Sequence, residues 1–349
     1  MVFSKEITAV DIGSSAIKVA RMKKKRGQLQ MIDTGRASLP AEVLEEPEQL
    51  VKILADLFSE MKYRPQYVTT AVSSKNVIIR NIEFPSMSEK ELSQALELGA
   101  EEYLTFPIEN LKFKYKVLKQ NQETMEILLA AINNEVLDNY VNIFERASLN
   151  LNVINVQPMA LLSLVHSQLE ITDPVMVVDI GARGSRIIIG DERDIYLVRN
   201  LEAGGETFSD ILKRKYDLSQ KEVRELKNSL NLDEELTKEE IEPETEVPKT
   251  FSPGEGPTSL TSLLDYFVKE IERSLEFFDK KYNNLPLEKI IFTGGGSMMN
   301  GLEDRINSRL ENRLESLDPL KDLAPDKKVN RDYAVAVGLV ASEVLANAV

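Results

Sequence analysis

The chain has 349 residues, a formal net charge of −14 and a sequence pI near 4.9. This length exceeds one ordinary hydrophobic core and predicts two or more folded units. The acidic balance argues against nucleic acid as a partner, and the absence of cysteine excludes disulfides, thiolate metal sites and thiol nucleophiles. No signal-peptide region and no apolar run of roughly 18 residues occurs, so we expect a cytoplasmic protein without direct membrane insertion.

The first part of the chain predicts one β-sheet with a covering helix, because β-branched runs flank a glycine turn and a helical period follows. The expected elements are strands at 6–12 and 16–22, a helix at 47–61, and strands at 67–72 and 76–83 that continue the sheet. The basic run at 23–27 is interpreted as a solvated hairpin tip rather than as an anion or lipid contact.

Residues 84–155 predict a small α+β module inserted into this pattern. Ser88 and Glu91 have the spacing of a capping box, which predicts a helix to about residue 102. Alternating apolar residues then predict a hairpin, followed by a second helix. These later elements are strands at 111–118 and 125–131 and a helix at 135–148.

The opening pattern restarts in the second half of the chain. Expected there are strands at 175–180, 185–190 and 194–199, helices at 206–216 and 219–230, a helix at 259–282, a strand at 289–293, and helices at 301–314 and 331–346. Residues 231–257 differ, because nine acidic residues stand against two lysines and four prolines interrupt the segment. This composition predicts an acidic mobile loop.

Three glycine-rich turns follow predicted strands, at 11–18, 179–185 and 294–297. Glycine lets backbone N–H groups approach a ligand, serine adds a hydroxyl donor, and an aspartate at a strand end can hold a hydrated metal ion. Ligands of open α/β sheets bind beyond the carboxyl ends of strands, where such turns lie. Neither the GxxxxGK[ST] nor the GxGxxG pattern occurs, which disfavours a P-loop or a dinucleotide fold.

Five segments appear in the order typical of one superfamily: Asp11–Lys18, Ile154–Leu161, Asp179–Ser185, Ile291–Ser297 and Tyr333–Leu339. On these segments the chain resembles the actin-like ATPases. Within them it resembles the PilM family of type IV pilus assembly, with more specific markers at 100–108 and 273–278. The resemblance implies an α/β fold with two homologous ribonuclease H-like lobes and an inserted small α+β subdomain.

The resemblance also implies a division into four subdomains. These are a first lobe, 1A, at 1–83 plus 156–174 plus 331–349; the inserted subdomain, 1C, at 84–155; a second lobe, 2A, at 175–204 plus 258–330; and subdomain 2B at 205–257, which carries the acidic loop.

ATP and Mg²⁺ are the cofactors that the resemblance implies. Its metal positions are Asp11 and Asp179; its phosphate positions are Gly13, Ser14, Ser15, Lys18, Gly181, Gly184 and Ser185; its nucleoside positions are Arg224, Lys227, Gly294, Gly295, Gly296 and Ser297. Gln157 is the candidate catalytic residue, which would position an attacking water. Pro158 and Met159 follow the pilus relatives rather than actin, so ATP binding is predicted and hydrolysis, weak or absent, is left open.

Structural interpretations compete at several positions. Asp11 and Asp179 could be turn formers after buried strands, and Lys18 could be a solvated strand residue. His166, the only histidine, lies in a leucine-rich helical stretch where a core-edge role outweighs catalysis. The Phe277–Phe278 pair is interpreted as core.

The partner that the resemblance implies is the N-terminal cytoplasmic tail of a PilN-like inner-membrane protein. This tail would bind in the cleft between the first lobe and the inserted subdomain, near residues 80–115, and would hold the protein at the inner membrane. An FtsA-like filament former, with weak self-association, and a small-molecule kinase are the alternatives. The C-terminal stretch 341–349 carries no Lys or Arg for anionic lipid, and no further Asp or His near the glycine turns suggests a kinase base.

Overall fold

The computed structural model describes residues 6–25, 28–73, 76–99, 110–169, 171–232, 234–236, 257–282, 285–310, 315–321, 323 and 329–346. The chain forms two compact units. The first unit consists of residues 1–167, 192–198 and 335–349, and the second consists of residues 168–191 and 199–334. None of the helices in the described ranges is both long and apolar enough to cross a membrane.

The first unit is built on a five-stranded sheet in the order β3-β2-β1-β4-β8. Its strands are β1 (Glu6–Ile12), β2 (Ala16–Lys25), β3 (Gln28–Ser38), β4 (Val68–Val72) and β8 (Leu151–Val156). The first three form an antiparallel meander, whereas β4 and β8 are added in parallel. β1 is buried along nearly its whole length because it is central and both of its faces are covered.

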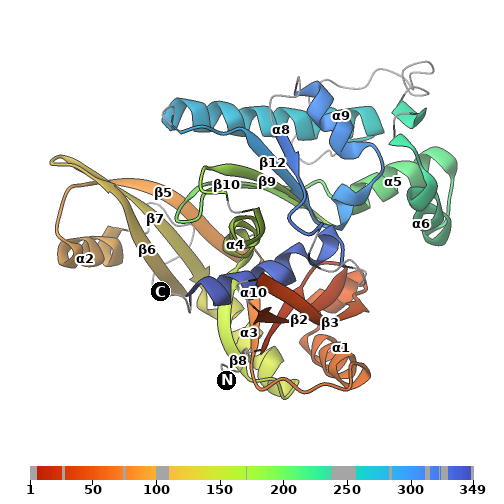
Figure 1. Ribbon diagram of the computed structural model, residues 1–349, viewed down its shortest axis with the longest axis horizontal. Coiled ribbons are helices and arrows are strands. Elements are labelled where there is room, and N and C mark those ends of the chain that lie inside the picture. Colours follow the sequence, from red (N-terminus) through yellow and green to blue (C-terminus); the bar gives the residue numbers. More distant parts are fainter. Residues whose placement is uncertain are drawn as a thin grey trace. The chain divides into compact units, whose positions relative to one another are not determined.

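Helices cover this sheet through apolar stripes. α1 (Pro47–Glu60) begins with proline at a position that needs no N–H donor, and it buries Leu50, Leu54 and Leu57 in one core. α3 (Asn134–Arg146), capped by the Asn133 side chain, adds Phe144 to that core. Two further helices, α4 (Gln157–Leu169) and α10 (Ala334–Ala346), are apolar on most faces and cross each other (Figure 1).

A smaller three-stranded sheet belongs to the same unit, in the order β5-β7-β6. It is formed by β5 (Val77–Pro85), β6 (Leu111–Gln120) and β7 (Thr124–Asn133), with α2 (Glu89–Gly99) on one face (Figure 1). Leu92 and Leu96 of α2 pack on Ile127 and Leu129 of the central strand β7. The capping box predicted for α2 is present, since the Ser88 backbone N–H donates to Glu91.

The pairing of two strands corrects the expected boundaries of this module. The strand expected at 76–83 does not continue the first sheet; it is β5, which pairs with β7. Residues 151–155, expected in the insertion, belong to β8, which pairs with β4. Alternating hydrophobicity predicts a strand but does not identify the strand with which it pairs, because pairing depends on residues far away in the sequence. The finer division into four subdomains stays a prediction.

The second unit repeats the topology of the first. Its sheet has the order β11-β10-β9-β12-β13, with β10 antiparallel and β12 parallel to the central strand β9. The strands are β9 (Val175–Ile180), β10 (Ser185–Gly190), β11 (Ile195–Leu201), β12 (Lys289–Thr293) and β13 (Glu315–Leu317). In the first sheet, too, the central strand has an antiparallel neighbour on one side and a parallel neighbour on the other, as expected for homologous halves.

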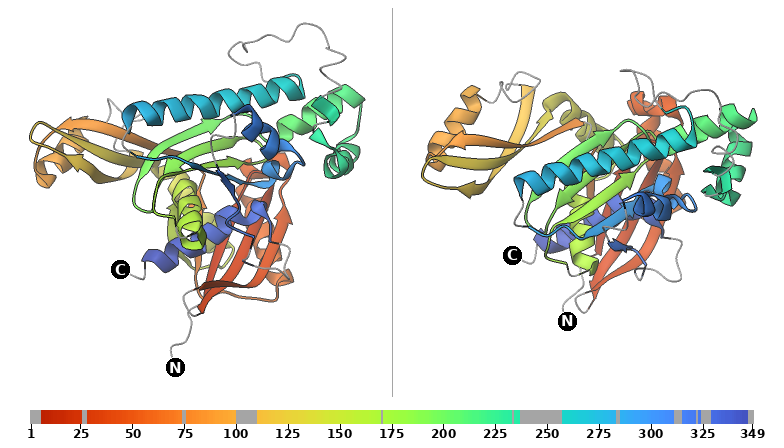
Figure 2. Two further views of the ribbon diagram at one scale, coloured as in Figure 1. Left: turned by 45° about the horizontal axis from the view of Figure 1, so that its top comes forward. Right: turned by 90° about the horizontal axis from the view of Figure 1, so that it is seen from above.

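Helices and short 3-10 turns complete the second unit. They are α5 (Gly205–Tyr216), α6 (Gln220–Ser229), α8 (Leu260–Lys281), η5 (Gly295–Met298), α9 (Leu302–Arg309) and η6 (Arg331–Tyr333). α8 lies along one face of the sheet (Figure 2), and its Phe267 stacks on Phe208 of α5 with ring centroids 6.2 Å apart. A capping box between Ser219 and Glu222 opens α6.

Residues 192–198, which form the turn before β11 and the first part of that strand, belong to the first unit because they are bonded to its three-stranded sheet. Lys116 of β6 donates to the Arg193 carbonyl at 2.9 Å and to the Asp194 carboxylate at 2.6 Å. Asn81 of β5 donates to the Tyr196 carbonyl at 3.4 Å. The three-stranded sheet therefore holds this turn through side chains from two of its strands.

Some expected elements and side-chain environments differ from the structure, and others agree with it. β3, β8 and β13 were not expected, and α9 ends at Arg309 rather than at residue 314. Phe278 is buried as predicted, whereas Phe277 is 38% exposed. His166 is buried on α4, in agreement with a core-edge role. The marker stretch 100–108 and most of the acidic segment 231–257 lie outside the described residues.

Gly338 allows α10 to cross α4 closely, and this generates a test of the fold. A Cβ at Gly338 would lie 2.1 Å from the Ala160 carbonyl oxygen. We expect Gly338→Ala to lower the free energy of unfolding by about 1–3 kcal/mol in urea denaturation, despite the better helix propensity of alanine. Gly35→Ala is the matched control, because its new Cβ would meet mainly the flexible Met61 side chain. Equal stability of the two variants would contradict the close crossing.

Candidate functional site

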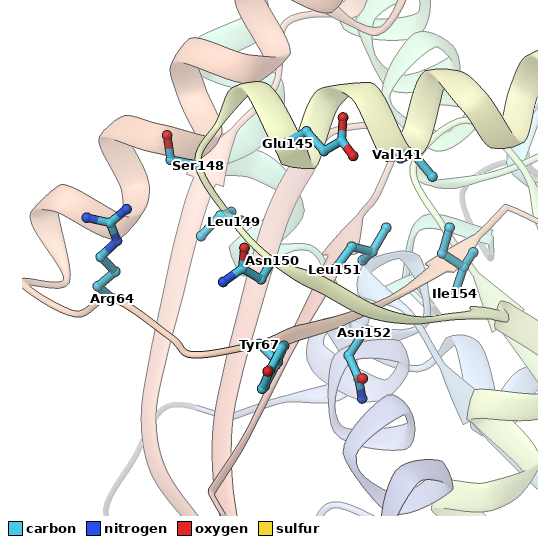
Figure 3. Close-up of a pocket in the computed structure, with 10 residues that line it drawn as sticks. All are labelled: Arg64, Tyr67, Val141, Glu145, Ser148, Leu149, Asn150, Leu151, Asn152 and Ile154. Carbon is cyan, nitrogen blue, oxygen red and sulfur yellow. The ribbon is translucent and has the colours of Figure 1, made fainter.

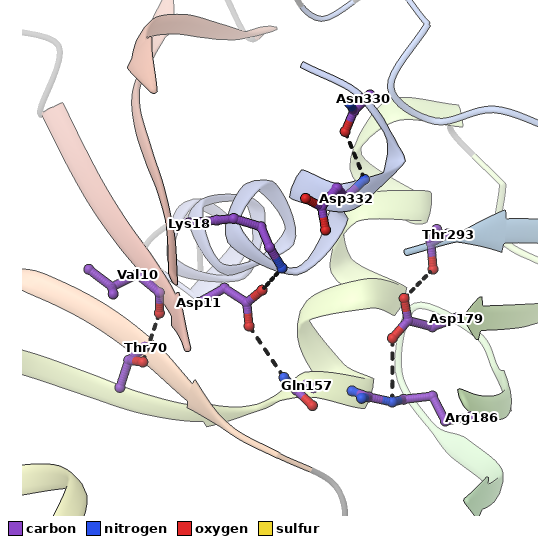
Figure 4. A network of polar contacts seen from close by, with 10 residues as sticks. All are labelled: Val10, Asp11, Lys18, Thr70, Gln157, Asp179, Arg186, Thr293, Asn330 and Asp332. Carbon is purple, nitrogen blue, oxygen red and sulfur yellow. Dashed lines mark hydrogen bonds and ion pairs between the residues drawn. The ribbon is translucent and has the colours of Figure 1, made fainter. Parts of the chain in front are cut away.

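The first glycine turn joins β1 to β2 above a buried ion pair. Asp11 and Lys18 stand opposite each other in the strand register, and the Lys18 ammonium lies 2.9 Å from Oδ2 of Asp11. Both side chains are buried. The Gln157 amide at the start of α4 donates to Oδ1 of Asp11 at 3.3 Å (Figure 4). The structure therefore brings together three of the predicted site residues within one unit.

The turn itself needs glycine for close packing. The Gly13 N–H donates to the Ala16 carbonyl at 3.0 Å, which closes the hairpin. A Cβ at Gly13 would lie 3.0 Å from that carbonyl oxygen and 3.1 Å from the Lys18 ammonium. Ser14 and Ser15, at the tip, are half-buried rather than covered. Both serines therefore keep part of their surface exposed at the tip of the turn.

The second turn repeats this arrangement with a different cation. Asp179, at the end of β9, stands opposite Arg186 of β10, with the Arg186 Nε 3.4 Å from Oδ2 of Asp179. The Thr293 hydroxyl, at the end of β12, donates to Oδ1 of Asp179 at 3.0 Å (Figure 4). Sequence reasoning missed Arg186. The signal was available, because Arg186 follows Asp179 by the same spacing as Lys18 follows Asp11.

The second turn also binds the start of α5. The Gly181 N–H donates to the Gly184 carbonyl at 3.0 Å, and the Gly205 N–H donates back to the Gly181 carbonyl at 2.8 Å. Ser185, predicted to clamp a phosphate, is 2% exposed, and its hydroxyl donates to the Ala203 carbonyl at 2.6 Å. A phosphate role for Ser185 stays a prediction, and it would require this hydroxyl to change its acceptor.

The third turn, at 294–297, is used mostly for packing. Gly294 has a φ of +82°, and a Cβ there would lie 2.4 Å from the Ile180 carbonyl oxygen. A Cβ at Gly296 would lie 2.4 Å from the Ile180 side chain. Ser297 is buried and donates its hydroxyl to the Gly294 carbonyl at 2.8 Å. Gly295 is the exposed member of this turn.

The two predicted nucleoside residues on α6 differ in environment. Arg224 is exposed, whereas the Lys227 ammonium is half-buried and donates to the Gly205 carbonyl at 2.8 Å and to the Ser209 hydroxyl at 3.2 Å. Burial lowers the pKa of Lys227 below its ordinary value, and the Glu206 carboxylate opposes this in part. Lys227 thus holds the start of α5, where Gly205 lies beside Gly296.

The donor set fits a weakly held magnesium ion. Among the described residues, no group of three or more His, Cys, Asp and Glu side chains could hold a metal ion by itself. Each turn offers one aspartate that already has a cationic partner. Mg²⁺ keeps several waters and is commonly bound by one or two carboxylates together with substrate phosphates. Asp11 and Asp179 fit that mode rather than a preformed metal cage.

A separate hollow of about 760 Å³ lies in the first unit (Figure 3). Its walls come from Arg64 and Tyr67 before β4, from Val141 and Glu145 of α3, and from residues 148–152 and 154, which lead into and form part of β8. Tyr67 is 52% exposed, and β8 is an edge strand of its sheet. None of these residues falls in 80–115, the stretch expected to contact a partner, so that expectation stays a prediction.

Comparison with known families decides the assignment. A family model described as type IV pilus assembly protein PilM matches residues 9–249 and 257–341. The chain belongs to the PilM family. One solved relative, from a PilM–PilN type IV pilus biogenesis complex, is 25% identical with a TM-score of 0.76, and the match covers 96% of this chain and 98% of that chain.

More distant structures bear on the fold alone. EutJ, an ethanolamine utilization protein of Carboxydothermus hydrogenoformans, has a TM-score of 0.57 at 12% identity, covering 97% of this chain and 89% of that one. MreB5 of Spiroplasma citri bound to ADP has a TM-score of 0.51 at 12% identity, covering 98% and 99%. The PilM family member described here therefore has the actin-like ATPase fold, and the fold class predicted from its sequence is confirmed.

The buried pair of Asp11 and Lys18 generates a stability test. Lys18→Met leaves a buried carboxylate without its cation, so we expect urea denaturation to give a loss of about 3–5 kcal/mol. The double variant Asp11→Asn/Lys18→Met removes both charges and should recover most of this loss. Glu6→Gln, which breaks the exposed pair with Arg21 in the same hairpin, should cost under about 1 kcal/mol. A double variant as unstable as Lys18→Met would contradict the charge argument.

The lowered pKa of Lys227 predicts a dependence of stability on pH. Between that pKa and the ordinary value of 10.5, the unfolded chain binds more protons than the folded chain. The unfolding free energy of wild type, relative to Lys227→Met, should therefore rise with pH across this window, by at most about 1.4 kcal/mol per pH unit. Urea titrations at several alkaline pH values measure this. Lys221→Met, at an exposed lysine of α6, should run parallel to wild type. The same parallel behaviour for Lys227→Met would refute the effect.

Proposed function

We propose that this protein is a cytoplasmic ATP-binding adaptor of the type IV pilus assembly complex at the inner membrane. It binds the N-terminal cytoplasmic tail of a PilN-like protein, and its affinity for that tail depends on whether ATP is bound. The observation that carries the nucleotide half is the duplicated turn, in which an aspartate at a strand end is paired across a glycine hairpin with Lys18 or Arg186. Membership of the PilM family and the PilM–PilN relative support the partner half.

The ion pairs suggest how each turn accepts a charged ligand. Without ligand, the pairing avoids an isolated buried charge, which would be costly. With Mg²⁺-ATP bound, Lys18 would supply positive charge to a phosphate oxygen, and Asp11 would help to hold the hydrated metal ion. Arg186 and Asp179, which form the equivalent pair, would have the same two roles. Bound Mg²⁺ would supply positive charge that neutralises the phosphates.

The N–H groups and hydroxyls at Ser14 and Ser15 donate to phosphate oxygens in this proposal, because they are the accessible donors of the first turn. Gln157 donates its amide N–H to Asp11 at 3.3 Å, which holds its side chain beside the first turn. This supports Gln157 as the candidate for water positioning and gives no rate for hydrolysis.

The hollow beside β8 supports a site for an extended partner tail. An edge strand offers unpaired backbone groups, and extended peptides commonly add to such edges with side chains entering neighbouring pockets. Here the hollow lies between β8 and α3 in the first unit, and Tyr67 and Ile154 give it apolar surface. A nucleotide shifts the grip on the tail only if it binds two conformations with different affinity.

Calorimetry on the full-length chain tests both halves. We expect Mg²⁺-ATP to bind with one-to-one stoichiometry, and a synthetic peptide with the tail sequence of the PilN-like protein to bind separately. Ser14→Ala/Ser15→Ala should weaken ATP binding at least tenfold, about 1.4 kcal/mol, by removing two hydroxyl donors. Tyr67→Ala should weaken peptide binding by a similar factor and leave ATP binding unchanged.

Two matched controls accompany these variants. Ser229→Ala removes an exposed hydroxyl of α6, and Leu285→Ala trims an exposed apolar side chain of the second unit; neither should change either affinity. Failure of wild type to bind ATP would reject the nucleotide half. ATP binding without peptide binding would reject the partner half, and identical ATP affinity with and without bound peptide would reject the coupling. Light scattering that rises with ATP would favour the filament alternative.

A further inference from the structure

Gly295 lies beside the side chain of Asp332, whereas its neighbours in the third turn pack against Ile180. Gly294 and Gly296 are required by packing against Ile180, and neither is exposed. Gly295 is exposed, and the three atoms nearest to a Cβ there would all belong to the Asp332 side chain, with Oδ1 at 3.3 Å. With no side chain at Gly295, only backbone lies on this side of the Asp332 carboxylate in the turn.

The position of Asp332 is fixed by the surrounding backbone. The Gly294 N–H donates to the Arg331 carbonyl at 2.9 Å, which ties η6 to the third turn. The Asp332 N–H donates to the Asn330 side chain at 3.0 Å (Figure 4). The Arg331 side chain is in turn paired with Glu303 and Asp318. These backbone hydrogen bonds at residues 331 and 332 place the Asp332 side chain beside Gly295.

The chemistry of a carboxylate limits what it can contact in a nucleotide. An ionised carboxylate only accepts hydrogen bonds, and it repels phosphate oxygens. The nucleoside offers two kinds of neutral donor, the ribose hydroxyls and the exocyclic amine of adenine. Carboxylates at the ends of strands in other nucleotide-binding folds accept from ribose hydroxyls. A carboxylate at the third turn would thus fix the nucleoside end and disfavour a reversed ligand.

We propose that Asp332 is a specificity-determining residue, whose carboxylate accepts a hydrogen bond from a neutral donor of the bound nucleoside across the bare backbone of Gly295. This inference rests on the proposed function, because it assumes that ATP binds at this turn. It adds a residue that the sequence motifs did not indicate, and it assigns Gly295 a role distinct from that of Gly294 and Gly296.

The test compares nucleotide analogues by calorimetry on the full-length chain. The two deoxy analogues, 2′-deoxy-ATP and 3′-deoxy-ATP, remove one ribose hydroxyl each, and inosine triphosphate replaces the exocyclic amine with an acceptor. We expect wild type to bind ATP at least fivefold tighter than one of these three, and the identity of that analogue distinguishes the ribose from the base. In Asp332→Ala this ratio should fall to about one through loss of ATP affinity, and Asp332→Asn, which keeps an acceptor oxygen, should retain part of it.

Gly295→Ala provides an independent variant, since the new methyl group covers Oδ1 of Asp332 without requiring an unusual φ. It should reduce the same ratio as Asp332→Ala. Asp304→Ala, which removes an exposed carboxylate from α9 of the same unit, is the control and should leave the ratio unchanged.

Thermal unfolding of each variant checks that it is folded. A ratio that is the same in wild type, Asp332→Ala and Gly295→Ala would overturn the inference, as would an equal loss of affinity for all four nucleotides. These results would leave the proposed function intact if wild type binds ATP. Absence of any nucleotide binding by wild type would overturn both.

Discussion

The feature on which both units depend is a buried ion pair between an aspartate at the end of a central strand and a cation on the next strand. Cross-strand register, rather than long-range folding, creates the pair, because Asp11 stands opposite Lys18 and Asp179 stands opposite Arg186. The second oxygen of each aspartate is bonded to a further element, by Gln157 in one unit and by Thr293 in the other. In each unit, one buried aspartate therefore contacts two further chain segments, and it links them to the end of the central strand.

The glycines of the turns are not equivalent, because each meets different neighbouring atoms. Gly13 is needed because of a tight hairpin, whereas Gly294 and Gly296 are needed because β9 ends directly against the third turn. A run of three glycines suggests one open surface for a ligand, yet two of the three are buried by protein. A glycine-rich sequence therefore overstates how much backbone a ligand can contact in this turn.

The sequence predicted the repeat, the topology class and most helices and strands correctly because these depend on local periodicity. It missed β3 and β13, where exposed polar positions and short length obscure alternation, and it assigned β5 to the wrong sheet because pairing depends on residues far along the chain. Among site residues, Asp11, Lys18 and Gln157 were expected together and lie together. Arg186 was missed although its spacing from Asp179 repeats that of Lys18 from Asp11, whereas the inward hydroxyl of Ser185 was missed because only the burial of β10 reveals it.

The way the chain is divided between the two units has a consequence for synthesis in the cell. The chain passes from one unit to the other after residues 167, 191, 198 and 334, so neither unit is a continuous segment. The first unit receives its last helix, α10, from the end of the chain, where Gly338 meets Ala160. A nascent chain would therefore expose the apolar surface of α4 until α10 has been synthesised, and such exposed surface is prone to aggregate. The first unit thus cannot complete its core before the whole second unit has left the ribosome.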